Sequence, residues 1–289
     1  MKNVSFLLLL FTVMLSAQNN RMIYEYHFRP DSTKMDSLKT EWMYLDISEK
    51  GSKYYSKNAF ESDSIVRESI KKQMASGSRN VQLSRQRSGG EVPYEIEKVY
   101  PSFETFLTTS IDHDWFKVKD ERKLQWQIGT EKKKIGEFEA QKATTKFAGR
   151  TWTAWFTTEV PVQDGPYKFS GLPGLIVAVE DATGSHKMEL KGIKKLTAKT
   201  EEDLNLQGKD IPMLRKKPLE ITRDQYQKRL KQYRNDPVQG MREMLSKPNS
   251  TVKINIGGKE ISDSKEILRV MEENLKQQMA QNNNHIELN

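Results

Sequence analysis

The sequence predicts a β-rich α+β protein, with a predominantly antiparallel, curved sheet and a helical C-terminal part. Two observations lead to this prediction. Many short runs alternate between apolar and polar side chains, as strands with one buried face do, and short turns separate them. After about residue 197 the apolar spacing becomes helical. We therefore expect an antiparallel β-rich domain over residues 18–196 and a mainly helical region over residues 197–289 that packs on the sheet.

The N-terminal part contains several strand patterns and one helix pattern. In residues 22–28 every second side chain is apolar or aromatic, so one face of this strand should be buried. Residues 42–47 and 53–56 form a predicted hairpin. Apolar positions then fall on one helical face, which predicts a helix over residues 62–74, followed by a polar loop over residues 77–90.

The strand signal is strongest in the middle of the chain. Lys132-Lys133-Lys134 predicts a turn ahead of this region. Residues 140–147 and 151–158 alternate and flank a predicted tight turn at Gly149-Arg150. Residues 175–179 are continuously apolar, as in a strand that is buried on both faces. Short connections between strands favour an antiparallel meander over alternating β-α units.

Helical signals dominate the C-terminal part. Thr222 and Gln225 have the spacing of a capping box and predict the start of a helix, which Asp236-Pro237 should end. Gly257-Gly258 predicts a hairpin turn. Residues 264–279 form a predicted amphipathic helix, and the polar residues from 281 onward are expected to fray.

The first residues have the features of a cleavable signal peptide. Lys2 precedes an apolar run over residues 6–15, and the small residues Ser16 and Ala17 follow. The run is too short for a bilayer-spanning helix, which needs about twenty residues. We therefore expect residues 1–17 to be a signal peptide cleaved after Ala17, a periplasmic or secreted protein, and no transmembrane segment in the mature chain.

The composition restricts the chemistry available to the chain. It has 289 residues, a formal net charge of +8 and no cysteine. Disulfides, thiolate metal sites, a cysteine nucleophile and an acylated lipoprotein cysteine are therefore excluded. The basic charge is compatible with anionic partners and with an ordinary mixed-charge surface. No nucleic-acid-binding motif is present, so we expect no nucleic acid partner.

The residue triplet Asp112-His113-Asp114 is a weak candidate for a metal or acid-base site. On a strand its two carboxylates would point away from the histidine, so a polar turn is the favoured interpretation. The chain contains no G-x-S-x-G nucleophile elbow, and Gly257-Gly258 lacks the Lys-Ser/Thr of a phosphate-binding loop. We therefore predict no catalytic residues and no cofactor.

Aromatic residues at alternating positions have two possible roles, in a ligand groove or in the hydrophobic core. They are Tyr24, Tyr26, Trp126, Trp152 and Trp155. Such residues can line a ligand groove, but at a spacing of two they more often form a core. Trp152 and Trp155 are three positions apart and should lie on opposite faces of one strand.

The most distinctive motif combines glycines and prolines with a buried strand. Its residues are Gly165, Pro166, Gly171, Leu172, Pro173, Gly174, Leu175 and Ile176. The glycines can adopt positive φ, and Pro173 favours extended geometry at the preceding residue. The structural interpretation is a turn that leads into a strand. A close approach of the backbone to a ligand is the functional alternative.

At this motif the sequence resembles the GLPGLI proteins, a family found mainly in Bacteroidota. Residues 171–176 match the six letters of the name, and residues 143–156 also look like the family's core segment. The resemblance is clear over about residues 135–181. Many members carry a cysteine near Ala140, which this chain lacks. The resemblance implies export, a β-rich fold, no established activity and genes near TonB-dependent transporters, and it supplies no catalytic residues.

Two functional hypotheses follow. The first is a non-enzymatic envelope protein that binds an outer-membrane transporter or an apolar ligand. By analogy with periplasmic lipoprotein carriers, we expect its curved sheet to wrap a helix. The alternative is a periplasmic hydrolase or metal-dependent enzyme, motivated by Asp112-His113-Asp114 and the many carboxylates.

Overall fold

The computed structural model describes residues 19–76, 90–196, 217–247, 252–256 and 259–288. The expected signal peptide, nearly all of the polar loop over residues 77–90 and the Gly257-Gly258 turn lie outside these residues. In chain order, the strands and helices are β1 (Asn20–Phe28), β2 (Lys39–Ser48), β3 (Gly51–Ser56), α1 (Lys57–Ala75), β4 (Glu95–Val99), β5 (Glu104–Ile111), β6 (Asp114–Asp120), β7 (Gln127–Ile135), β8 (Phe138–Phe147), β9 (Arg150–Thr157), β10 (Leu175–Asp181), β11 (His186–Lys195), β12 (Leu219–Thr222), α3 (Arg223–Asn235), α4 (Gln239–Leu245), β13 (Ile254–Ile256), β14 (Lys259–Ile261) and α5 (Ser264–Gln281).

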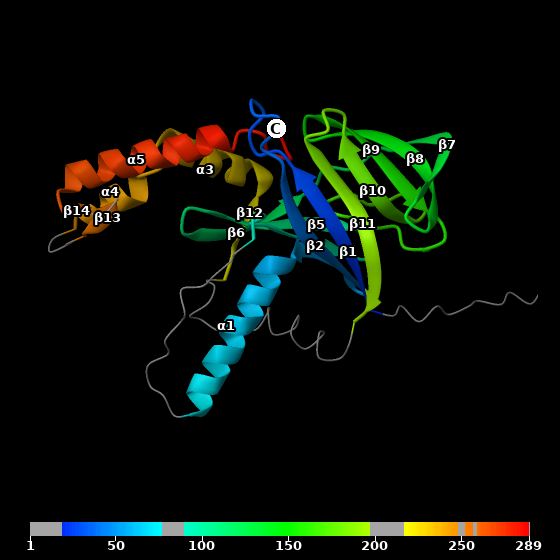
Figure 1. Ribbon diagram of the computed structural model, residues 1–289, viewed down its shortest axis with the longest axis horizontal. Coiled ribbons are helices and arrows are strands. Elements are labelled where there is room, and N and C mark those ends of the chain that lie inside the picture. Colours follow the sequence, from blue (N-terminus) through cyan, green and yellow to red (C-terminus); the bar gives the residue numbers. More distant parts are fainter. Residues whose placement is uncertain (1–18, 77–89, 197–216, 248–251, 257–258, 289) are drawn as a thin grey trace, which may run out of the picture.

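One large curved sheet confirms the predicted fold class (Figure 1). Its strand order is β12-β6-β5-β4-β3-β2-β1-β11-β10-β9-β8-β7. Neighbouring strands are antiparallel except β12, which pairs in parallel with β6. The first strand lies in the middle because β1 pairs with both β2 and β11. The first and last strands of the β-rich region, β1 and β11, are therefore hydrogen-bonded neighbours in the sheet. The sequence patterns did not predict β6 or β12.

The two faces of the sheet have different roles. The inner face carries the main hydrophobic cluster, to which Met22, Tyr24 and Tyr26 contribute as the alternation in β1 predicted. The opposite, outer face carries mostly charged side chains, such as the salt bridge between Arg21 Nε and Asp46 Oδ1 at 2.7 Å. This division fixes where a ligand can reach the sheet.

Helix α1 lies against the outer face and is not wrapped by the sheet, so that expectation was wrong. The ring of Phe60 contacts Tyr44 and Tyr55, with ring centroids 6.3 and 5.5 Å apart, and the rest of α1 extends away from the sheet (Figure 1). The helix begins earlier than predicted because Ser56 Oγ accepts the Ala59 N–H at 3.1 Å, which satisfies a free donor of the first turn.

The inner face is filled by the segment that follows β9. Tyr167, Phe169 and Leu172 from this segment are at most 2% exposed and belong to the main cluster. They occupy the space in which a carrier protein would hold an apolar ligand. The glycine- and proline-rich motif over residues 165–176 therefore supplies part of the core of its own sheet.

Two predicted turns lie at shifted positions. Lys132-Lys133-Lys134 belongs to β7, and the chain turns after it at Gly136, whose φ is 58°. The next turn is formed by Ala148 and Gly149, with φ of 52° and 80°, and Arg150 already belongs to β9. Two-residue hairpin turns favour positive φ at both central residues, which explains the second position.

Among the C-terminal helices, α3 packs on one end of the sheet. Thr222 and Gln225 form the predicted capping box at the start of α3, and the helix ends at Asn235, as predicted from the following Asp236-Pro237. A second, smaller cluster joins α3 to the sheet. It contains Ile111, Phe116 and Val118 with Leu107, Ile221, Tyr226, Leu230 and Tyr233.

The chain after α5 is held against the sheet, so the expected fraying was wrong. The Asn284 N–H donates to Pro30 O and the Leu288 N–H donates to Ala148 O, both at 2.9 Å. Between them, Ile286 packs against the main cluster. Polar composition alone predicted a free end. The backbone and side chains of this tail (residues 282–288) have fixed partners instead.

We predict that Gly174→Ala destabilises the protein far more than Gly171→Ala. A Cβ at Gly174 would lie 2.0 Å from the Thr157 carbonyl oxygen, whereas one at Gly171 meets no atom within 4 Å. The first change should cost at least about 3 kcal/mol, because backbone must move, and the second about 1–2 kcal/mol, from its φ of 88°. Urea denaturation of both variants measures the difference, and equal losses would contradict this account.

Candidate functional site

The connection between β9 and β10, residues 158–174, is called the motif segment below. A fully buried ion pair holds it against the sheet. Lys98 of β4 and Asp164 have 0% exposed side chains, and Lys98 Nζ contacts Asp164 Oδ1. The same ammonium donates to Gly165 O at 2.7 Å and to Phe169 O at 3.3 Å. Tyr100 donates its hydroxyl to the other carboxylate oxygen. Burial lowers the pKa of Lys98, and the adjacent Asp164 opposes that shift.

A second charge cluster connects the motif segment to the tail. Lys168 Nζ lies 2.7 Å from Asp120 Oδ2 and 2.5 Å from Glu287 Oε1. Arg122 bridges the same two carboxylates, at 2.6 Å from Asp120 and 2.7 Å from Glu287. Burial alone would raise the pKa of both acids. The two cations outweigh burial and hold the pKa of Asp120 well below its usual range and that of Glu287 below its ordinary value.

This second cluster borders a cavity of about 470 Å³ that also touches Ser170 and Gly171 of the motif segment. Its buried acid and base, Asp120 and Lys168, are already paired with each other and with neighbouring charges. The arrangement stabilises the segment and the tail.

A third buried cluster holds the tail against β9 and β10. Arg150 Nη1 pairs with Asp181 Oδ2 at 2.9 Å, and Arg150 Nη2 donates to Asn284 Oδ1 and His285 O, both at 2.6 Å. Beside it, His186 Nδ1 lies 2.7 Å from the Tyr26 hydroxyl. Burial, and then the charge of Arg150, lower the pKa of His186 to about 4.

The weak metal candidate lies apart from these clusters. Asp112 is in the turn between β5 and β6, with a φ of 55°, and the His113 side chain is 89% exposed. His113 Nε2 is 3.4 Å from Asp112 Oδ1, and Asp114 begins the next strand. Across residues 19–76, 90–196, 217–247, 252–256 and 259–288, no three His, Cys, Asp or Glu side chains converge on a point that could hold a metal ion.

The motif residues are distributed between turn and core. Leu172, Leu175 and Ile176 are 0% exposed. A Cβ added to Gly165 would lie 2.7 Å from the Ile176 side chain, so this glycine permits close packing. Pro166 and Pro173 lie in the same connection between β9 and β10. These contacts give the motif a structural role.

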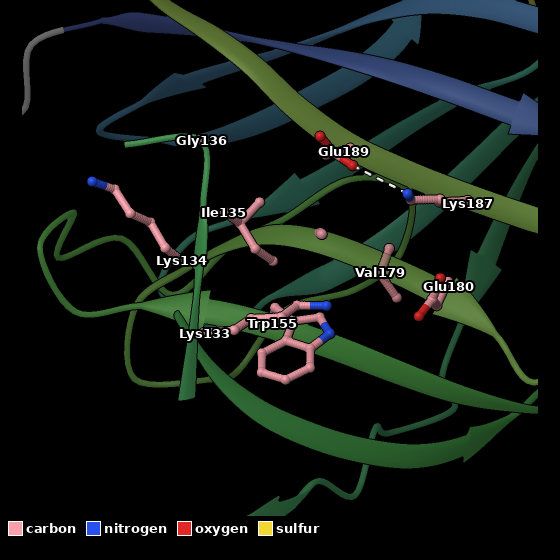
Figure 2. Close-up of a pocket in the computed structure, with 10 residues that line it drawn as sticks. Lys133, Lys134, Ile135, Gly136, Trp155, Val179, Glu180, Lys187 and Glu189 are labelled. Carbon is pink, nitrogen blue, oxygen red and sulfur yellow. Dashed lines mark ion pairs between the residues drawn. The ribbon is translucent and has the colours of Figure 1, made fainter. Parts of the chain in front are cut away.

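A pocket on the outer face is the site that sequence reasoning missed. It has a volume of about 290 Å³ and lies among β7, β9, β10 and β11 (Figure 2). Its lining residues are Lys133, Lys134, Ile135, Gly136, Trp155, Ala178, Val179, Glu180, Lys187 and Glu189. The position of Trp155 on the face opposite to Trp152 was the available signal, because a core aromatic would be expected on the inner face.

Trp155 forms the centre of this pocket. Its side chain is 4% exposed, and Lys133 Nζ lies 3.9 Å from the centre of its ring (Figure 2). The indole Nε1–H is buried and has no acceptor among the described residues. A buried donor without an acceptor costs free energy, so a ligand that supplies one would be favoured.

Comparisons with known proteins give little functional information. A protein family described as "Protein of unknown function (Porph_ging)" matches residues 148–178, which include Trp155 and the motif from Gly165 to Ile176. No curated protein matches the chain. Two solved structures of PNGF-II, in space groups C2 and P21, are similar with TM-scores of 0.48 and 0.47 and 15% identity. The matches cover 75% of this chain and 34% of the PNGF-II chain, so this chain spans about a third of that length.

Lys98→Met should destabilise the protein by about 3–5 kcal/mol, because it leaves the Asp164 carboxylate buried without its cation. Adding Asp164→Asn should recover part of this loss, since a neutral amide is cheaper to bury. Lys119→Met, which breaks an exposed pair with Glu104, is the matched control and should cost less than about 1 kcal/mol. Chemical denaturation of the wild type and these three variants tests the pair, and a control-sized loss for Lys98→Met would refute the assigned role.

Because of His186, the free energy of unfolding should decrease as the pH is lowered below about 6.5. The ordinary pKa of 6.5 applies to the unfolded chain, whereas the folded pKa is about 4. The unfolded state therefore takes up a proton first, and stability is lost as pH falls from about 6.5 toward about 4. His186→Phe keeps a ring beside Tyr26 and should remove a slope that approaches about 1.4 kcal/mol per pH unit.

The measurement is the free energy of unfolding at several pH values between about 7 and about 5, where few carboxylates titrate. His113→Gln, in the exposed turn, is the control and should keep the wild-type slope. Parallel curves for wild type and His186→Phe would show that the buried histidine does not resist protonation.

Proposed function

We propose that this chain is an exported, non-enzymatic binding protein of the bacterial cell envelope and a GLPGLI protein. The leader-type residues 1–17 support export to the periplasm or beyond, and residues 171–176 support the family. No helix in the described part of the chain has the length and apolar character needed to cross a bilayer. An outer-membrane TonB-dependent transporter is the partner class that the family resemblance suggests.

The main support for this proposal is that the buried ionisable side chains are paired with one another. The buried pairs Lys98–Asp164, Lys168–Glu287 and Arg150–Asp181 all hold one part of the chain to another. Groups committed in this way stabilise a scaffold and do not transfer protons to a substrate. In the outer pocket, in contrast, Lys133 and the Trp155 Nε1–H have no acceptor among the described residues. A stable scaffold with a surface pocket that contains a hydrogen-bond donor without an acceptor is suited to binding a ligand.

The alternative of a hydrolase or metal-dependent enzyme has less support. Its sequence basis, Asp112-His113-Asp114, lies in a hairpin turn where the histidine is exposed. A catalytic site would hold such groups in a concave, partly desolvated environment. Metal analysis of the purified protein distinguishes the two proposals, because a stoichiometric bound metal ion would favour the enzyme.

Export and binding can be tested in one bacterial expression system. We expect the mature protein outside the cytoplasm with Gln18 as its first residue, as measured by cell fractionation and intact mass. Leu9→Arg, which interrupts the apolar run, should leave the precursor in the cytoplasm. Processed wild-type protein should co-sediment with outer-membrane vesicles more than with plain phospholipid vesicles. An unprocessed cytoplasmic chain, or equal sedimentation with both vesicles, would overturn the proposal.

A further inference from the structure

The pocket around Trp155 contains donor groups that have no acceptor in the described part of the chain. Lys134 lines the pocket, but its side chain points away from the Trp155 ring (Figure 2). Lys133 comes from the edge strand β7, and in the described part of the chain it has no carboxylate within ion-pair distance. Lys133 contacts the face of the Trp155 ring instead, at 3.9 Å. The indole Nε1–H of Trp155 also lacks an acceptor there. Two donor groups beside the ring, the Lys133 ammonium and the Trp155 Nε1–H, are therefore available to an anion.

The neighbouring lysines of this face differ from Lys133, because they are paired with carboxylates. Lys142 pairs with Glu131 at 2.7 Å, and Lys187 pairs with Glu189 at 3.2 Å. Glu189 also accepts from Lys191 at 2.6 Å. These charges are neutralised within the sheet, as on an ordinary mixed-charge surface. Lys133 lies beside them without such a partner in the described part of the chain.

The surroundings set the size and polarity of a ligand. A volume of about 290 Å³ is at the small end of ligand sites, which typically begin near about 300 Å³. Glu180 on β10 lines the pocket and can accept hydrogen bonds from hydroxyl groups (Figure 2). The aromatic ring offers a flat surface once the flexible Lys133 side chain turns toward a ligand. These features fit one compact molecule that carries an anionic group.

We propose that the Trp155 pocket binds the carboxylate of a compact, polar small molecule of about monosaccharide size. This inference rests on the proposed binding function and names its site and ligand chemistry. Lys133 donates to the carboxylate, and the Trp155 Nε1–H donates to an oxygen of the same ligand. Charge-assisted hydrogen bonds in a partly buried site are stronger than exposed ones, which gives the pocket its preference for an anion.

Calorimetric titration of the mature protein tests this proposal with three probes. D-glucuronate carries both a sugar ring and a carboxylate, D-glucose lacks the carboxylate, and glutarate lacks the ring. We expect D-glucuronate to bind and D-glucose to bind at least about tenfold more weakly. If glutarate binds as well as D-glucuronate, the site recognises the carboxylate alone. Weaker glutarate binding identifies an acidic sugar. Equal binding of D-glucose and D-glucuronate, or no binding of either acid, overturns the proposal.

Variants locate the binding site. Lys133→Gln should weaken D-glucuronate binding about tenfold, because it removes one charge-assisted hydrogen bond. Lys134→Gln should change the affinity less, because the Lys134 side chain points away from the ring. Lys132→Gln removes the same charge from the same strand outside the pocket, so it should leave affinity within about twofold. Trp155→Phe keeps an aromatic ring and removes the N–H donor, and it should also weaken binding. If Lys133→Gln and Lys132→Gln bind alike, the acid does not bind in this pocket.

The outcome is separable from that of the proposed function. Wild-type protein that is exported and sediments with outer-membrane vesicles, but binds neither acid, remains an envelope binding protein whose ligand chemistry is different. Protein that stays unprocessed in the cytoplasm contradicts the envelope function, even if the pocket binds D-glucuronate in vitro.

Discussion

The buried pair of Lys98 and Asp164 is the constraint on which the rest of the fold depends. Both side chains are fully buried, so each charge is tolerated only because the other lies beside it. The pair joins β4 to the segment between β9 and β10, and its cation also satisfies two carbonyl groups of that segment. With the segment held there, Phe169 and Leu172 complete the inner core.

This constraint determines which face of the sheet can bind a ligand. A curved sheet with an empty inner face would resemble a carrier for apolar molecules. Here Tyr167, Phe169 and Leu172 already fill the space, and the tail adds Ile286 at its border. Glu287 then contacts Lys168, so the tail and the motif segment hold each other in place. A ligand is left with the outer face and the edges of the sheet.

Sequence patterns predicted the parts of this structure that depend on local alternation. Met22, Tyr24 and Tyr26 are buried together, and the capping box at Thr222 starts a helix, because both follow from a repeat or spacing within a few residues. The position of α1 and the docking of the tail were not predictable in this way. Asn284 contacts Arg150, and Lys98 contacts Asp164, although the partners are far apart in the sequence. Such pairings cannot be predicted from composition or local spacing.

Strand β9 shows why the candidate site was harder to predict than the fold. Trp152 and Trp155 are the same residue type on the same strand, and both are almost fully buried. Trp152 donates its indole N–H to Phe147 O at 3.1 Å, so its polar group is satisfied within the core. Trp155 faces outward among lysines, and its N–H has no acceptor in the described residues. Alternation assigns the two rings to opposite faces, but the satisfaction of their N–H groups depends on neighbouring strands. The difference between a core tryptophan and a binding tryptophan is therefore a property of the assembled sheet.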